Sequence, residues 1–422
     1  MPGSTKYRNW DSYLLENPWV KLYVTPQLGG RIIQMEMDGY EFFFVHPLLA
    51  GKEPGSTRLG ENGSWLNFGG EKIWPAPQGW NSPDEWPGPP DPVLDSGEYT
   101  TEINNENENA LKQISPFDPY TGLQIIKEVS VDKSRLEVKV LVTFKNKGNE
   151  VKNWSIWPVL QLKTLEETAG QYHVVCPVNP ASRFSNGYKI MHGLVNNPQY
   201  KIDNHGNLRV DYQYLVGKIG LDTNSKWAAF VDTKTGKVLV LMFQHEKDKT
   251  YPENTSFQVW TAGRGMVYSR NVVREHLNDK MLNPPYLEME LLSPLMKIQP
   301  GKEFQYEYRM LACTIPKNQT VKSACEFGVV VTPLTINQQE KGVVIQARYG
   351  VFSEGILKIH KTKVSENEPP LCLYETKVSP LEGITIELFI DDNSLTECFV
   401  SVGLYDLDNH LTEEIDKIKI QI

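Results

Sequence analysis

The stretch Arg31-Ile32-Ile33-Gln34-Met35-Glu36-Met37-Asp38-Gly39-Tyr40-Glu41-Phe42-Phe43-Phe44-Val45 joins two runs rich in apolar residues through an Asp-Gly pair. Asp-Gly between such runs is typical of a tight β-hairpin, because both turn positions need positive φ angles. The stretch therefore predicts two antiparallel strands, at residues 31–37 and 40–45. It also indicates the fold class, because similar signals recur along the chain.

Strand signals continue through most of the remaining sequence. Residues 136–144 alternate between apolar and mostly polar side chains, which is the period of a half-buried strand. Residues 227–231 and 237–243 flank a turn at Thr235-Gly236 and predict a second hairpin. Few segments keep a helical period for more than two turns, so we expect only short helices, near Pro47 or Met281. The sequence predicts an all-β protein.

The bulk composition is that of a folded protein without a nucleic-acid surface. The chain has 422 residues, 40% of them hydrophobic, and a net charge of −9. Mixed charges without a Lys/Arg run argue against a nucleic-acid partner. We expect no membrane partner, because no apolar stretch approaches the length of a transmembrane helix. No signal peptide is visible and the five cysteines are scattered, so we expect a cytoplasmic protein. The oligomeric state cannot be predicted from this sequence.

The chain divides into two expected domains near Pro316. The short polar segment 316–323 follows a predicted strand at residues 304–313. After it, about seven short strands separated by turn signals fit an immunoglobulin-like sandwich of about 100 residues. We therefore predict one domain at residues 1–316 and a second at residues 317–422.

A tryptophan-rich segment offers the first functional signal. It reads Asn67-Phe68-Gly69-Gly70-Glu71-Lys72-Ile73-Trp74-Pro75-Ala76-Pro77-Gln78-Gly79-Trp80, and four of the ten tryptophans lie within residues 65–86. Indole rings near Asn, Gln, Glu and Lys suit sugar binding, with stacking on the ring and hydrogen bonds to its hydroxyls. Packing of the indoles in a core is the alternative, since buried Trp also needs a partner for its N–H.

The second signal is a pair of carboxylates on one predicted strand. In Tyr286-Leu287-Glu288-Met289-Glu290-Leu291-Leu292, alternation places Glu288 and Glu290 on the same face. Partial burial would raise the pKa of at least one of them and favour a general base near neutral pH. A solvent-exposed face is the alternative. Glycosidic hydrolysis ranks lower, because neighbours on one strand do not naturally flank a scissile bond.

The histidines do not have the spacing of a metal site. The eight residues lack an H-x-H or H-E-x-x-H pattern, and no phosphate loop or dinucleotide fingerprint is present, so we expect no metal and no cofactor. His46 is the best functional candidate among them, at the end of the strand that contains Phe42 to Val45. Trp157 and Trp260, in other predicted strands, could extend an aromatic lining, although core packing is the simpler interpretation.

Several of these motifs together resemble the galactose mutarotase-like (aldose 1-epimerase) superfamily. The opening Val24 to Ile32 followed by the Asp38-Gly39 hairpin is similar to the start of that fold. Residues 69–77, 218–222, 251–253 and 288–294 resemble the DUF4380-type branch of the superfamily. The resemblance covers roughly residues 10–315. It implies a large antiparallel β-supersandwich with a sugar cleft on one concave face, followed here by the C-terminal sandwich.

The resemblance also implies roles for individual residues. Aldose 1-epimerases use a Glu base late in the chain, which maps onto Glu288, with Glu290 as the alternative. Their catalytic His does not map, because residues 153–161 read Asn-Trp-Ser-Ile-Trp-Pro-Val-Leu-Gln here. The expected acid is Lys72 or His46. The expected ligand-binding residues are Arg31, Trp74, Trp157, Gln161, Lys218 and Glu290.

Three functions follow as hypotheses. The leading one is a mutarotase-type protein that interconverts anomers or epimers of a sugar or sugar acid by acid/base chemistry in an aromatic-lined cleft. The second is a non-catalytic carbohydrate-binding protein that kept the cleft and lost the catalytic His. The third is an accessory sandwich that acts in assembly through its C-terminal domain.

Overall fold

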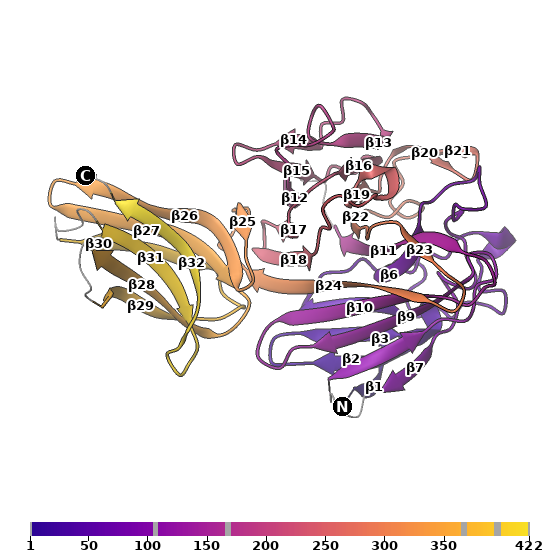
Figure 1. The fold of residues 1–422 in the computed structure, drawn as a ribbon, viewed down its shortest axis with the longest axis horizontal. Helices are drawn as coiled ribbons and strands as arrows, with labels where there is room; N and C mark the ends of the chain where they lie inside the picture. The colour runs from indigo at the N-terminus through magenta and orange to yellow at the C-terminus, as the bar shows by residue number, and fades with distance from the viewer. Residues whose placement is uncertain (1, 104–108, 165–169, 364–368, 392–397, 421–422) are drawn as a thin grey trace. The chain divides into compact units, whose positions relative to one another are not determined.

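The computed structural model describes residues 2–103, 109–164, 170–363, 369–391 and 398–420 (Figure 1). These residues form antiparallel β-sheets, and their only helical segments are three 3₁₀ turns, η1 (Pro26–Leu28), η2 (Glu61–Gly63) and η3 (Pro252–Asn254). The all-β prediction is confirmed. None of the helices in these residues has the length and apolarity needed to span a membrane.

The chain divides into two compact units. The first comprises residues 1–133, 138–228 and 241–310, and the second comprises residues 134–137, 229–240 and 311–422. The domain boundary expected at residue 316 stays a prediction.

The sheet that carries the candidate site has twelve strands. In spatial order its main path is β1 (Gly3–Tyr7), β2 (Trp10–Glu16), β3 (Lys21–Thr25), β4 (Arg31–Met37), β6 (Glu71–Ala76), β11 (Lys152–Lys163), β22 (Tyr286–Leu291), β19 (Phe257–Thr261), β16 (Gly217–Leu221) and β13 (Lys189–Gly193). Two short strands join it at the side, β5 (Tyr40–Glu41) on β4 and β23 (Met296–Ile298) on β11.

A second sheet has ten strands. Its order is β14 (Tyr200–Ile202), β15 (Asn207–Asp211), β12 (Tyr172–Pro177), β17 (Trp227–Asp232), β18 (Lys237–Phe243), β24 (Glu303–Thr314), β10 (Glu137–Asn146), β9 (Leu123–Val131), β8 (Ala110–Ile114) and β7 (Thr100–Ile103). The strands β20 (Gly265–Ser269) and β21 (Val272–His276) pair only with each other in a separate hairpin.

Both predicted hairpins are present, and their turns have the expected chemistry. Strands β4 and β5 are joined by Asp38 and Gly39, whose φ angles are 50° and 74°. Strands β17 and β18 lie side by side around the turn at Gly236, whose φ is 78°. In β10, the side chains of the predicted alternating run are buried at the apolar positions.

The short helices expected near Pro47 and Met281 are wrong, because both segments form isolated turns. The Asp279 carboxylate accepts hydrogen bonds from the backbone N–H groups of Met281 and Leu282. Two prolines follow at 284 and 285, and proline cannot continue a helix, so the turn ends there.

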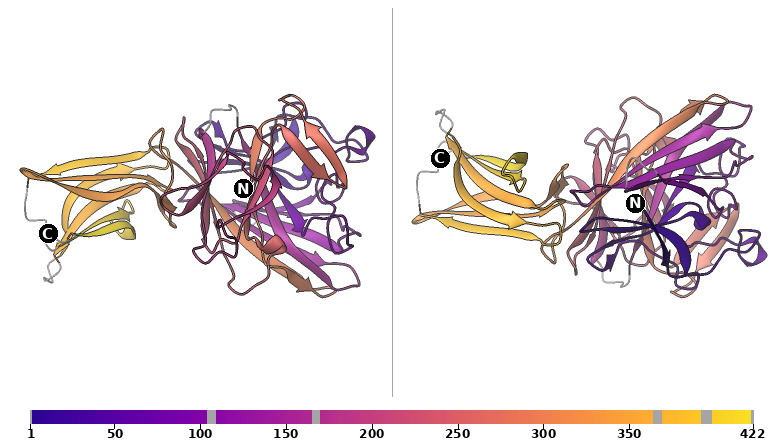
Figure 2. Two further views of the ribbon diagram at one scale, coloured as in Figure 1. Left: turned by 90° about the horizontal axis from the view of Figure 1, so that it is seen from above. Right: turned by 90° about the horizontal axis from the view of Figure 1, so that it is seen from below.

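The second unit contains two four-stranded sheets, which Figure 2 draws in orange and yellow. One sheet has the order β25 (Ser323–Ala324), β26 (Gly328–Gln339), β27 (Gly342–Val351) and β30 (Ile384–Ile390), and the other has β29 (Leu371–Val378), β28 (Gly355–Lys363), β31 (Cys398–Tyr405) and β32 (Leu411–Ile420). Residues of both sheets, such as Ile345, Leu357 and Val400, share one apolar core. This arrangement is the predicted C-terminal β-sandwich.

Candidate functional site

The strand β22 presents both predicted carboxylates on one face of the twelve-stranded sheet. The strand pairing places Glu288 opposite Gln161 on one side and opposite Trp260 on the other. Glu290 lies one pleat further along the same face, opposite Gln258. Both Glu side chains are buried, so the alternative of a solvent-exposed face does not hold.

Glu288 forms one half of a buried acid/base pair. The Lys72 Nζ of β6 lies 3.4 Å from Glu288 Oε1. Gln161 Nε2 donates a 2.7 Å hydrogen bond to the same oxygen. The sequence predicted each of these residues as part of the site, and the fold brings all three together from β6, β11 and β22.

Glu290 forms a second pair beside the first. Its Oε2 accepts hydrogen bonds from Trp157 Nε1 at 2.8 Å and from Lys218 Nζ at 2.9 Å. The Lys218 ammonium also lies over the Trp157 ring, 4.7 Å from its centroid. Burial raises the pKa of Glu290, while Lys218 and Trp157 act in the opposite direction by stabilising the carboxylate. The Glu290 Oε1 atom, in contrast, has no hydrogen-bond partner.

Aromatic rings surround the Lys72 ammonium. Its Nζ lies 4.6 Å from the Trp74 ring centroid and 5.6 Å from that of Trp65. Burial disfavours the charged form and lowers the pKa of Lys72 from 10.5 to about 8, although Glu288 partly offsets the effect. A lysine with such a pKa can donate and accept a proton near neutral pH.

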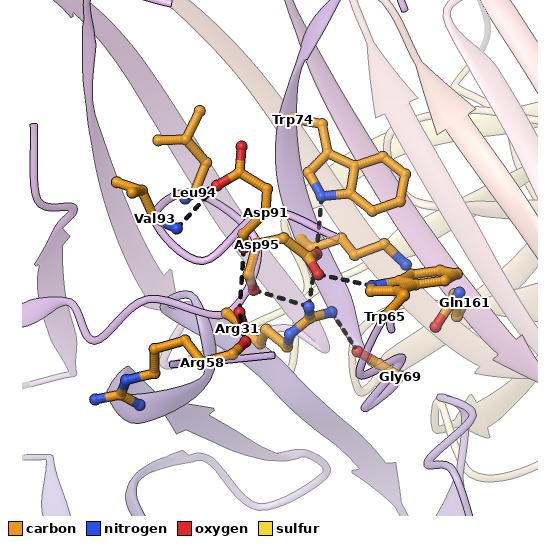
Figure 3. Close-up of polar contacts among 12 residues, drawn as sticks. Arg31, Arg58, Trp65, Gly69, Trp74, Asp91, Val93, Leu94, Asp95 and Gln161 are labelled. Carbon is orange, nitrogen blue, oxygen red and sulfur yellow. Dashed lines mark hydrogen bonds and ion pairs between the residues drawn. The ribbon is translucent and has the colours of Figure 1, made fainter. Parts of the chain in front are cut away.

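Asp95 holds two of these indoles in place (Figure 3). Its carboxylate accepts hydrogen bonds from Trp65 Nε1 at 2.7 Å and from Trp74 Nε1 at 3.0 Å. Arg31 Nη2 pairs with the same carboxylate at 2.7 Å, and Arg31 Nη1 donates to the Gly69 carbonyl. The Arg31 side chain, predicted to bind ligand, is fully buried, and its hydrogen bonds are with Asp95 and Gly69. This geometry suits a positioning role for Arg31.

His46, the other predicted acid, makes local contacts. Its Nδ1 accepts a hydrogen bond from the Leu48 N–H at 3.2 Å, and its ring packs edge-on against Phe44. Burial lowers the pKa of His46, so the neutral form dominates at neutral pH. Lys72, rather than His46, is the cation that pairs with Glu288.

Three residues of the site were not predicted as members of it. Asp95 lies in a loop without a recognisable motif, so no sequence signal could have identified it. The Tyr286 hydroxyl contacts the side chains of Asn67 and Trp260. Asn67 and Tyr286 are the first residues of the two segments quoted above, and only the tertiary structure brings the two side chains together.

The described part of the chain contains no group of three or more His, Cys, Asp or Glu side chains arranged to hold a metal ion. Three side chains of the face that carries Glu288 and Glu290, those of Trp65, Lys218 and Trp260, remain partly exposed and mark the side from which a ligand could approach.

A family model described as "Domain of unknown function (DUF4380)" matches residues 11–311, which include both acid/base pairs. The chain belongs to the DUF4380 family. The predicted membership of this branch is confirmed. None of the curated proteins matches the sequence.

Two of the solved structures similar to this DUF4380 chain carry mutarotase descriptions, and a third has a different one. A putative mutarotase (YeaD) from Salmonella typhimurium is 11% identical, with a TM-score of 0.45 over 74% of this chain and 93% of the other. A galactose mutarotase-like protein from Clostridium acetobutylicum is 8% identical, with a TM-score of 0.45 over 75% and 99%. A TPR-domain containing protein from Parabacteroides distasonis is 13% identical, with a TM-score of 0.44, and the matched region spans 47% of that chain.

Proposed function

We propose that this protein interconverts the anomers of a sugar by acid/base chemistry, with Glu288 as the base and Lys72 as the acid. The observation that carries the proposal is the 3.4 Å separation of Lys72 Nζ and Glu288 Oε1. In a cyclic sugar the anomeric hydroxyl and the ring oxygen are bonded to the same carbon. An acid and a base that serve these two oxygens must therefore be close neighbours, as Lys72 and Glu288 are.

The proposed reaction proceeds through the open-chain sugar. Glu288 accepts the proton of the anomeric hydroxyl while the Lys72 ammonium donates a proton to the ring oxygen. The bond between the anomeric carbon and the ring oxygen breaks and gives an aldehyde. Rotation of the aldehyde followed by the reverse proton transfers closes the ring in the other configuration and restores both residues.

The surrounding residues support this division of roles. Gln161 Nε2 donates to Glu288 Oε1 and fixes the carboxylate. The indoles of Trp65 and Trp74 face the Lys72 ammonium and stabilise its charged form in a buried setting. Asp95 holds both indoles through their N–H groups, so we assign Asp95 and Arg31 to positioning.

A non-catalytic sugar-binding protein is the second candidate. The observation that favours it is the burial of the site, since Trp157 and Glu290 are only 3% and 1% exposed. A site that binds a sugar without converting it would still use Trp157 and Glu290 to contact the sugar. It would not need a side chain that donates a proton. The two candidates share their binding residues and differ in whether Lys72 transfers a proton.

The test is NMR exchange spectroscopy on a panel of free aldoses and uronic acids. We expect the protein to accelerate α/β exchange of at least one sugar. Glu288→Gln should slow it by about 100-fold or more, the usual size of a general-base contribution. Glu303→Gln, the same change at an exposed position of β24, is the matched control and should leave the rate of α/β exchange unchanged. Binding without acceleration would support the second candidate and overturn the first.

A further inference from the structure

Glu290 has an unsatisfied hydrogen-bond acceptor that the proposed reaction does not use. Glu290 Oε1 is buried and has no partner, and the same holds for Gln161 Oε1 and Asn67 Oδ1. A buried acceptor without a donor is costly, so the acceptors of Glu290 and Gln161, which both adjoin Glu288 on one face of the sheet, require an explanation. Asn67 lies further from Glu290, beside Tyr286. All three acceptors belong to side chains that are nine-tenths buried or more.

Two indole N–H groups and both cations of this face are paired with protein carboxylates. The indole N–H groups of Trp74 and Trp157 bond Asp95 and Glu290. The two ammonium groups, of Lys72 and Lys218, are each paired with a carboxylate. The cations of the site are therefore already paired with carboxylates, while Glu290 Oε1 and Gln161 Oε1 are free to accept a hydrogen bond from a ligand hydroxyl.

The spacing fits the two ends of a sugar ring. Glu288 and Glu290 are two residues apart on one strand, which separates them by about 6.6 Å along the chain. If Glu288 and Lys72 act at the anomeric carbon, Glu290 faces a part of the ligand remote from it. Hydroxyl groups there could donate to Glu290 Oε1. A carboxylate or phosphate there would place a second negative charge against Glu290.

We propose that Glu290, with Lys218 and Trp157, forms a specificity subsite that accepts hydroxyl groups at the end of the ligand remote from the reacting carbon and rejects an anionic group there. This inference rests on the proposed function, because the anomeric carbon is placed by Glu288 and Lys72. The subsite selects uncharged sugars over sugar acids and sugar phosphates.

The test measures binding of sugars matched except at carbon 6. Saturation-transfer NMR titrations compare glucose with glucuronic acid and glucose 6-phosphate, and galactose with galacturonic acid. We expect the neutral member of each bound pair to bind at least about tenfold more tightly, since one lost charged hydrogen bond is worth at least that factor. Glu290→Gln should reduce the preference to less than about threefold. Glu303→Gln should retain it.

The possible outcomes separate this inference from the proposed function. Equal or tighter binding of the acids to the unmodified protein would overturn the subsite, and so would a preference that Glu290→Gln leaves intact. A preference for neutral sugars without accelerated exchange would support the subsite and overturn the catalytic proposal. Failure of every sugar to bind would overturn both.

A separate observation concerns the β20–β21 hairpin, which is held at both ends across the site face. Near its base, the Met266 carbonyl lies 2.7 Å from Nε2 of His192 on β13. At its tip, Arg270 donates hydrogen bonds to the carbonyls of Gly88, Pro89 and Pro90, in the loop that follows β6. Tyr268 packs edge-on against Trp80 of the same loop, with ring centroids 5.3 Å apart.

The sheet order shows what lies between these two anchors. The strands β11, β22, β19 and β16 separate β6 from β13, and they carry Trp157, both carboxylates, Trp260 and Lys218. His192 is opposite Lys218 in the strand pairing and therefore on the same face. The hairpin pairs with no strand of the sheet, so its position depends on the contacts at its ends. Figure 1 shows β20 and β21 near β13.

We infer that this hairpin is a lid over the site, latched at its tip by Arg270. The test uses Arg270→Ala, with Arg274→Ala on the exposed part of the same hairpin as the control. We expect Arg270→Ala to speed amide hydrogen exchange of residues 265–276 and acetylation of Lys72 by about tenfold, from the loss of charged hydrogen bonds. Arg274→Ala should leave both rates unchanged. Unchanged rates in Arg270→Ala, or equal effects of both variants, would overturn the lid.

Discussion

Glu71 and Lys72 are neighbours on β6 that point to opposite faces of one sheet, and their surroundings differ. On the face that contacts the ten-stranded sheet, here called the inner face, Glu71 Oε2 accepts a hydrogen bond from Lys127 Nζ at 2.7 Å. Glu71 Oε1 accepts one from the Tyr308 hydroxyl at 2.6 Å. On the site face, Lys72 is 3.4 Å from Glu288, while Glu290 and Gln161 each have an oxygen without a partner.

The difference separates a structural charge cluster from a functional one. Both carboxylate oxygens of Glu71 accept hydrogen bonds from side chains of the ten-stranded sheet, Lys127 on β9 and Tyr308 on β24. This cluster therefore links the two sheets and needs no ligand. The site-face cluster is also largely buried, although Lys218 is partly exposed, and it is incomplete. A buried polar group left unsatisfied reduces stability, which makes an incomplete cluster a better candidate for function than a complete one.

The largest effect should follow from breaking the inner cluster. Glu71→Gln leaves Lys127 buried without a counter-charge, and we expect a loss of about 3–5 kcal/mol in the free energy of unfolding. Urea unfolding followed by tryptophan fluorescence would measure it. In the double variant Glu71→Leu/Lys127→Met both charges are gone, so it should regain part of the loss. A loss below about 1 kcal/mol in Glu71→Gln would show that the inner cluster is not structural.

The next effect concerns stability and pH at Lys72. Its pKa is about 8 in the folded protein and 10.5 as the ordinary value, because burial disfavours the ammonium. Between these pH values the unfolded chain binds more protons, so the folded protein gains stability as pH rises through this window. Relative to Lys72→Met, the free energy of unfolding should increase by about 2–3 kcal/mol from pH 8 to 10.5. If the free energies of unfolding of the unmodified protein and of Lys72→Met changed equally with pH, the lowered pKa of Lys72 would be contradicted.

A similar shift should appear in catalysis. If the Lys72 ammonium is the acid, kcat/KM for anomer exchange should fall about tenfold per pH unit above about pH 8, as the ammonium loses its proton. Lys72→Arg keeps its charge, so any residual rate should not fall in this range. NMR exchange rates from pH 6 to 10 would measure both. An undiminished rate of the unmodified protein at pH 10 would exclude Lys72 as the acid.

The smallest effect should come from an exposed pair. Lys139 and Glu307 lie 2.7 Å apart on the ten-stranded sheet, with side chains 49% and 40% exposed. Water screens such pairs, so Lys139→Ala should change the free energy of unfolding by less than about 1 kcal/mol. The same urea titration serves as the measurement. A loss as large as that of Glu71→Gln would mean that burial does not distinguish the two clusters.

Local sequence signals predicted the strands and the faces of the key residues. The Asp38-Gly39 turn determined a hairpin because its two positions adopt positive φ angles. The alternation of Tyr286 to Leu292 placed Glu288 and Glu290 on one face, because successive side chains of a strand point to opposite sides. The family resemblance, confirmed by the match over residues 11–311, added Lys72, Gln161 and Lys218 as candidates.

Which of these residues meet was decided only by the tertiary structure. Lys72 and Glu288 are 216 positions apart, and their contact depends on β11 lying between β6 and β22. Asp95 bonds Arg31, Trp65 and Trp74, and it lies in a loop without a recognisable motif. The sequence therefore could not show whether Arg31 positions other residues or binds a ligand. Periodicity fixes the direction of a side chain, whereas long-range strand pairing fixes its partners, its burial and therefore its pKa.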